Sequence, residues 1–131
     1  MAPKITYTGI NIQYPITQMI LSSEKIIETR KYPIPKAYIG QKMVIIETPG
    51  KAQTFKARMV GFVTFGESFR YASKSDFYRD TKLHCVTPES TWRWIDGEPK
   101  YGWPINSVES FARPLPLQKK SGIKFSKGIV I

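Results

Sequence analysis

Short stretches in which β-branched and aromatic residues alternate with polar ones recur along the whole chain. This alternation is typical of β-strands, because neighbouring side chains of a strand point to opposite faces. We therefore predict strands over six segments, namely residues 5–13, 25–31, 42–48, 55–65, 103–117 and 128–131. Gly61 interrupts the fourth segment, where it favours a bend or bulge of the kind that a barrel needs.

Proline and glycine mark the loops between these segments. Pro33 and Pro35 are so close together that residues 32–36 are expected to form a loop, since each proline removes a donor from a strand ladder. Pro49 and Gly50 predict a tight turn between the third and fourth strands.

A short helix is predicted between the first two strands. Pro15 suits the first helical position, and Ile16, Met19 and Ile20 then fall on one face. We expect this helix to end near residues 22–24.

Two further short helices are predicted in the second half of the chain. Ser73 or Ser75 can cap a helix that runs to about residue 79. Residues 87–89, Thr-Pro-Glu, have the composition of a helix start and would place Trp92 and Ile95 on one face.

Several strands with short helices between them indicate an α+β fold, and a small β-barrel is favoured over a sandwich. A doubly wound parallel sheet is disfavoured because the helices are too few and too short. At 131 residues, 41% of them hydrophobic, residues 1–131 are expected to form one domain.

The composition excludes several kinds of site. One cysteine, Cys85, and one histidine, His84, cannot assemble a zinc site of Cys and His ligands, and no phosphate-binding G-x-x-x-x-G-K-[ST] loop occurs. We therefore expect no metal and no other cofactor. We also expect no membrane span, because no apolar run approaches the ~18–20 residues that a bilayer requires. The single cysteine fits a reducing, cytoplasmic compartment, and a monomer is the expected state.

Basic residues outnumber acidic ones by 20 to 10, which gives a formal net charge of +10. Such a field attracts polyanions, so nucleic acid is the leading class of partner.

The segment that follows the first predicted strand carries a family resemblance. Residues 15–30 end in Ser23, Lys25, Glu28 and Arg30, which is similar to the G-x-K-x-x-E-x-R pattern of the ASCH domain, with serine in the glycine position. The order of residues 61–65, His84, residues 101–105 and residues 114–116 also resembles the barrel strand, helical insert and closing strand of that family. The resemblance implies a PUA-like barrel and RNA or a nucleoside as partner.

The resemblance places a ligand-binding cleft at Lys25, Glu28 and Arg30. On a strand Glu28 and Arg30 share one face, and Lys25 at the preceding turn can swing toward them. The alternative is an ordinary surface ion pair between Glu28 and Arg30. Tyr32 and Trp103 are the expected platforms on which a base would stack.

An enzyme acting on RNA or a modified nucleoside is the competing hypothesis. The resemblance implies an N4-acylcytidine amidohydrolase-like or ribonuclease-like activity, with Lys25, Glu28 and Thr29 as catalytic residues. Amidohydrolase-type members have a threonine three residues after the lysine, where this chain has Glu28. Their further glutamate would correspond to Glu67, or to Asp76 in its place. A protein-interaction module is the third class.

The remaining notable residues have a structural interpretation beside a functional one. His84 is either structural or a further proton carrier, and Cys85 is expected to be a small buried hydrophobe. Trp92 is expected in the core and Trp94 on a lid.

Overall fold

The computed structural model comprises residues 1–131 and describes residues 5–51, 54–117 and 124–131. Seven strands and a few short helices follow one another along the described chain. The elements are β1 (Thr6–Gln13), α1 (Ile16–Leu21), β2 (Ile27–Arg30), η1 (Lys36–Tyr38), β3 (Met43–Thr48), β4 (Arg58–Phe65), β5 (Phe69–Arg70), α2 (Lys74–Arg79), α3 (Thr81–His84), β6 (Tyr101–Pro116) and β7 (Phe125–Val130). The predicted strands are all present, and β5 is an additional one.

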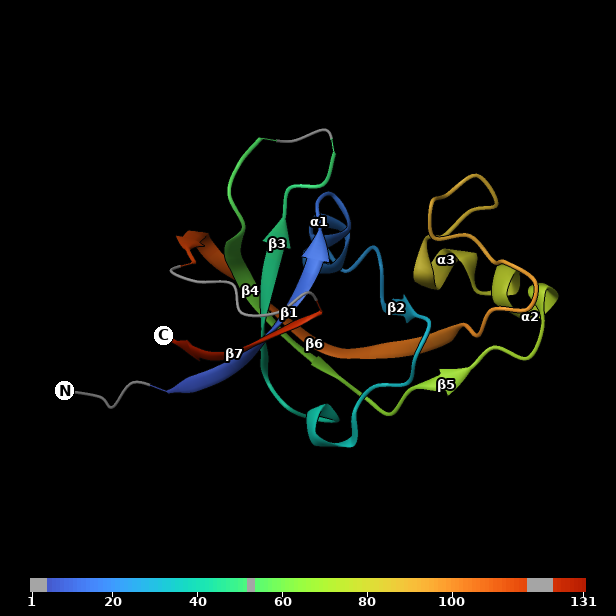
Figure 1. Ribbon diagram of the computed structural model, residues 1–131, viewed down its shortest axis with the longest axis horizontal. Helices are drawn as coiled ribbons and strands as arrows, with labels where there is room; N and C mark the ends of the chain where they lie inside the picture. The colour runs from blue at the N-terminus through green and yellow to red at the C-terminus, as the bar shows by residue number, and fades with distance from the viewer. Residues whose placement is uncertain (1–4, 52–53, 118–123) are drawn as a thin grey trace.

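One mixed, seven-stranded sheet organises the molecule (Figure 1), in the order β2-β6-β4-β3-β1-β7, with β5 also paired to β6. β1 and β3 are parallel, with Gly9 opposite Val44 and Gln13 opposite Thr48. The other pairs are antiparallel. The 16-residue strand β6 links two regions, because its residues 101–104 pair with β2 and β5 and its residues 105–116 pair with β4.

The sheet is not closed into a barrel, which corrects that part of the prediction, whereas the α+β class is confirmed. Its end strands β2 and β7 form no ladder with each other in the part of the chain that the structure describes. β2 has only four residues, all paired to β6. The gap between β2 and β1 is bridged by a side chain and not by a strand ladder, because Arg30 donates a hydrogen bond to the Asn11 carbonyl oxygen. We call this gap, flanked by residues 11–13 and 28–30, the open seam.

β3 lies at the centre of the core because it is buried on both faces. Met43 and Ile45 belong to the main hydrophobic cluster inside the curved sheet, and Val44 and Ile46 belong to a second cluster on the other face. The largest side chain of the main cluster is Trp103, which is fully buried. A continuous apolar run is the pattern expected of such a strand.

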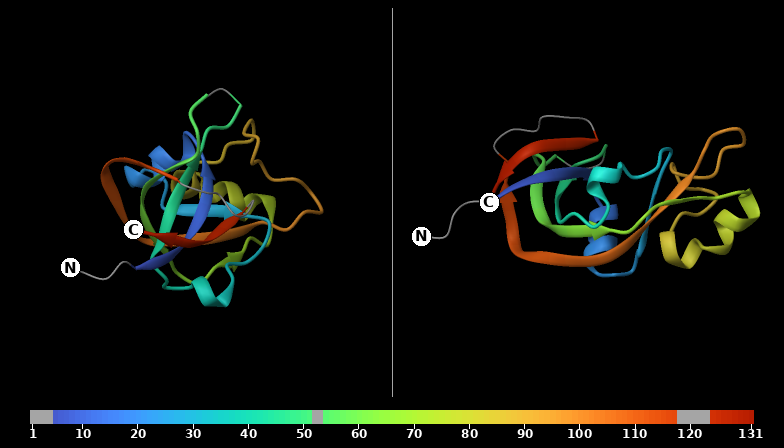
Figure 2. Two further views of the ribbon diagram at one scale, coloured as in Figure 1. Left: turned by 60° about the vertical axis from the view of Figure 1, so that its left-hand side comes forward. Right: turned by 90° about the horizontal axis from the view of Figure 1, so that it is seen from below.

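α2, α3 and the loop that follows them gather at one end of the molecule, away from the termini (Figure 2). The predicted cap is confirmed, because the Ser73 hydroxyl accepts a hydrogen bond from the backbone N–H of Asp76. α3 was not predicted. It ends at Cys85, whose φ of 62° is left-handed.

The helix predicted from residue 87 is wrong, since residues 87–99 form a loop. Side chains from other elements hold this loop and replace helical hydrogen bonds. The backbone N–H of Trp94 donates to the Tyr78 hydroxyl, and Lys100 Nζ donates to the Trp92 carbonyl oxygen. The predicted places of the two tryptophans are also corrected, because Trp92 is 46% exposed while Trp94 is half-buried against Phe77.

The predicted irregularity at Gly61 is confirmed, because the register between β4 and β6 shifts between Met59 and Gly61. The backbones approach closely here. A Cβ atom on Gly61 would press against the carbonyl oxygen of Glu109, closer than side chains can lie.

Replacing Gly61 with alanine should therefore lower the free energy of unfolding by about 1–3 kcal/mol, because a rigid backbone atom has to move. Urea denaturation measures the change. Gly66→Ala is the matched control, since its Cβ would meet only the flexible Asn106 side chain, at 3.1 Å, and we expect a change within about 1 kcal/mol. Equal effects of the two variants would contradict the close approach at Gly61.

Candidate functional site

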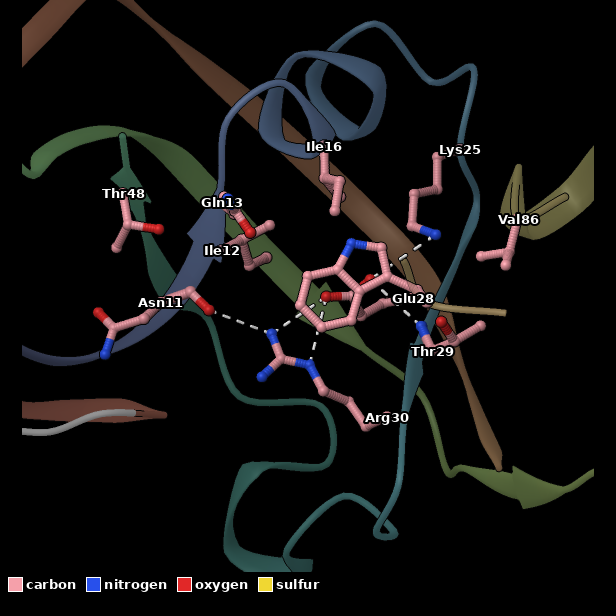
Figure 3. Close-up of a pocket in the computed structure, with 11 residues that line it drawn as sticks. Asn11, Ile12, Gln13, Ile16, Lys25, Glu28, Thr29, Arg30, Thr48 and Val86 are labelled. Atoms are coloured by element: carbon pink, nitrogen blue, oxygen red, sulfur yellow. Dashed lines mark hydrogen bonds and ion pairs between the residues drawn. The ribbon is translucent and has the colours of Figure 1, made fainter. Parts of the chain in front are cut away.

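A cavity of about 290 Å³ lies at the open seam (Figure 3). We call it the seam cavity. Its walls come from β1, α1, β2, the end of β3 and the loop after α3. The lining residues are Asn11, Ile12, Gln13, Ile16, Lys25, Glu28, Thr29, Arg30, Thr48, Val86 and Trp92.

Glu28 is at the centre of a buried charged group on the floor of this cavity. Its Oε2 accepts from Arg30 Nη2 at 3.0 Å and from Arg30 Nε at 3.3 Å. Its Oε1 accepts from the Thr29 backbone N–H at 3.2 Å and lies 3.7 Å from Lys25 Nζ. The structure thus brings together the three charged residues that the sequence singled out, and the alternative of an exposed surface pair is wrong.

The turn before β2 directs Lys25 into the cavity. Ser23 adopts a φ of 64°, the left-handed conformation that favours glycine, although it departs from the glycine of the ASCH pattern. Lys25 is 4% exposed, and its Nζ donates to the carbonyl oxygen of His84. Burial lowers the pKa of Lys25 and outweighs the opposing effect of the Glu28 carboxylate.

Arg30 joins the site to the rest of the fold. Burial alone would lower its pKa, but Glu28 and Tyr32 outweigh burial and raise the pKa of the guanidinium. Nη1 donates to the Tyr32 hydroxyl at 3.1 Å, and Nη2 donates to the Asn11 carbonyl oxygen at 3.2 Å. Arg30 is therefore occupied by protein partners and fixes the position of Glu28.

The two predicted stacking residues lie beneath and beside the charged group. Trp103 is 0% exposed and its Nε1 donates to the Tyr32 carbonyl oxygen, so the expectation that a base stacks on Trp103 is corrected. Its ring instead supports the Arg30 guanidinium, 5.5 Å from the ring centroid. Tyr32 is half-buried edge-on against Trp103, and Lys124 Nζ lies 4.1 Å from its ring centroid.

The structure does not bring the other predicted catalytic groups to a common point. Thr29 lines the cavity, but strand alternation places its side chain on the opposite face of β2 from Glu28 and Arg30. The described lining includes neither Glu67, which is exposed, nor Asp76, which pairs with Arg79 at 3.2 Å. No group of His, Cys, Asp and Glu among the described residues is arranged to hold a metal ion.

His84 has the structural role. It is 0% exposed, its Nδ1 accepts from the Val86 N–H at 3.0 Å, and its Nε2 therefore donates to the Phe77 carbonyl oxygen at 2.6 Å. Burial lowers the pKa of His84. Cys85 is partly exposed, which corrects the expectation of a buried hydrophobe, and burial raises the pKa of its thiol.

Sequence reasoning missed two buried groups that position the cavity walls. Lys100 is 7% exposed and holds the loop that carries Trp92. Glu47 is fully buried, accepting from Thr17 and Gln18 of α1 and pairing with Arg58 Nε at 2.9 Å. The one feature of the sequence that could have pointed to Glu47 is its position directly after the apolar residues 43–46 of a predicted strand.

Comparison with known proteins supports the fold. No protein-family description matches the sequence, and no curated protein matches it either. Among solved structures, the ASCH protein from Zymomonas mobilis superimposes with a TM-score of 0.70 at 14% identity, covering 92% of this chain and 85% of that one. A Tyr-to-Phe variant and a Ser-to-Ala variant of that protein each match with a TM-score of 0.69 and 14% identity over 92% of this chain, and over 88% and 86% of theirs. The chain has the fold of an ASCH domain.

The part of the chain that the structure describes contains no helix long and apolar enough to cross a membrane.

Because the chain has a single histidine, its titration can be followed without ambiguity by NMR of the imidazole protons. We expect the pKa of His84 in the folded protein to lie below 6.5, since burial disfavours the charged ring. As the pH falls below 6.5, unfolded His84 takes up a proton that the folded form resists, so this residue makes the fold less stable in acid. A pKa at or above 6.5 would contradict the buried, neutral ring.

Glu28→Gln should lower the free energy of unfolding by about 3–5 kcal/mol, because it leaves two cations buried beside an uncharged amide. Urea denaturation at neutral pH tests this. Glu98→Gln is the control, since Glu98 and Lys31 form an exposed pair at 3.3 Å worth about 0–1 kcal/mol. A loss at Glu28 as small as that at Glu98 would contradict the central role of the carboxylate.

Proposed function

We propose that the chain binds RNA or a nucleoside, with one base of the ligand inside the seam cavity. The observation that carries this proposal is the buried group of Lys25, Glu28 and Arg30 on the cavity floor, with the exposed indole of Trp92 in the lining of the same cavity. Two cations and one carboxylate give the floor a net positive charge, which suits a ligand rich in oxygen acceptors.

Lys25 is the group on the floor with donor capacity for a ligand. Its Nζ donates to the His84 carbonyl oxygen, whereas its 3.7 Å separation from Glu28 Oε1 is longer than a hydrogen bond. An ammonium has three donors, so a base carbonyl or phosphate oxygen that enters the cavity can accept from Nζ. Arg30 keeps a supporting role because Glu28, Tyr32 and Asn11 engage its guanidinium.

The size and walls of the cavity favour a single flat ring. Its volume of about 290 Å³ is close to the lower limit of the ~300–1,000 Å³ that is typical of small-molecule sites. The cavity can therefore hold one base but not a duplex. Ile12, Ile16 and Val86 supply apolar surface, and Trp92 supplies an aromatic face. Unpaired bases stack on such rings while basic residues attract their phosphates, in agreement with the net charge of +10.

A hydrolase acting on RNA or a modified nucleoside is the second candidate, which the buried position of Lys25 favours. A lowered pKa brings the amine closer to the range in which lysines exchange protons during a reaction. With an N4-acylcytidine, water would attack the acyl carbon and Glu28 would accept the water proton. Lys25 would donate to the developing oxyanion, the C–N bond would break, and the released amine would take up the proton.

Calorimetric titration with the four ribonucleosides and with a single-stranded RNA tests the proposal. Trp92→Ala should weaken binding about 5- to 150-fold, because one base–aromatic stack contributes ~1–3 kcal/mol. Ile95→Ala is the matched control, since Ile95 is 39% exposed in the same loop but does not line the seam cavity.

Mass spectrometry of the recovered ligand separates the two candidates. An unchanged ligand supports binding alone, whereas a deacylated nucleoside or a shortened strand supports the hydrolase. Binding of a matching DNA strand with equal affinity would contradict selectivity for RNA. Absence of binding to any of these ligands at low salt would contradict both candidates.

A further inference from the structure

A larger, outer cavity of about 670 Å³ adjoins the seam cavity. The two cavities share the lining residues Gln13, Ile16 and Trp92, so they are neighbours with Trp92 in the wall of both. The outer cavity lies over the start of α1 and the turn after β3. Its lining residues are Gln13, Tyr14, Pro15, Ile16, Pro49, Lys51, Thr91 and Trp92.

The two cavities differ in chemistry. The seam cavity has the buried carboxylate of Glu28, the buried ammonium of Lys25 and the largely buried guanidinium of Arg30, whereas Lys51 is the one charged residue among the described residues that line the outer cavity. Tyr14 and Trp92 provide rings, Pro15 and Pro49 provide flat apolar surface, and Lys51 is exposed to solvent. Rings together with a single exposed ammonium suit a stacked base with its phosphate.

Trp92 stands between the cavities on a backbone that is held in place. The backbone N–H of Trp92 donates to the Ser90 hydroxyl at 3.0 Å, and the Trp92 carbonyl oxygen accepts from the buried Lys100 Nζ at 2.8 Å. The side chain nevertheless remains 46% exposed. Because its backbone is already anchored, the segment that carries this ring loses little backbone freedom when a ligand stacks on it, which favours binding.

We infer that the outer cavity is a second nucleotide subsite, which takes the nucleotide next to the one in the seam cavity, with Lys51 on the phosphate that joins them. This inference rests on the proposed function and deepens it, because it makes the ligand an oligoribonucleotide of at least two residues. The shared wall of the two cavities, the positive charge of Lys51 and the aromatic walls carry it.

Titration of the intact chain with the four ribonucleosides and the four homodinucleoside monophosphates tests the second subsite. The dinucleotides should bind about 5- to 150-fold more tightly than the nucleosides, the gain expected of one further stacked base. Lys51→Gln should reduce this gain and flatten the slope of log K against log salt by about 1, while nucleoside affinity stays within about twofold. Lys36→Gln is the control, because exposed Lys36 lies in η1, at the opposite edge of the molecule from the turn after β3 (Figure 1).

The outcomes separate this inference from the proposed function. Nucleoside binding without a gain for dinucleotides would overturn the second subsite and leave the seam cavity as the site of a single base. A gain that Lys51→Gln and Lys36→Gln affect equally would also overturn it. If neither nucleosides nor dinucleotides bind, the proposed function fails as well.

Discussion

The structure depends on the burial of the Glu28 carboxylate between Lys25 and Arg30. Removing three charges from water is costly, and the cost is offset only if each charge has partners with good geometry. Arg30 provides two donors to Glu28 and extends one more to the Asn11 carbonyl oxygen of β1. The Arg30 side chain therefore connects β2 to β1 where no ladder joins them, and it holds the two strands in place at the open seam.

The open seam explains why a cavity exists in so small a protein. A ladder between β2 and residues 11–13 of β1 would fill the space between these two strands with backbone hydrogen bonds. Instead α1 and the loop after α3 stand over the gap, and their side chains leave a hollow above the charged floor. Lys100 and Glu47 hold the walls in a similar way, because each is a buried charged side chain that hydrogen-bonds a wall segment, the loop at Trp92 and helix α1 respectively.

The places where prediction from sequence failed share one cause. Trp103 was expected to offer a stacking surface and Trp92 to lie in the core, yet the first is fully buried and the second 46% exposed. Trp103 lies opposite Glu28 in the ladder between β2 and β6, so distant residues cover it. The loop that carries Trp92 is held by Tyr78 and Lys100, and its helix-like start at residues 87–89 forms a single turn, closed by the Ser90 N–H and the Thr87 carbonyl oxygen, instead of a helix.

The strands, the first helix and a serine cap at residue 73 or 75 could be predicted from the chain alone, because they follow from alternation and spacing between near neighbours. The grouping of Lys25, Glu28 and Arg30 was predicted from the resemblance to the ASCH pattern. The open sheet, the position of Trp103 beneath Arg30 and the place of Trp92 in the cavity lining could be seen only in the folded structure. Those features arise from contacts between segments far apart in the chain. Which face of a strand or loop becomes buried depends on the partner it meets, and a local pattern carries no information about that partner.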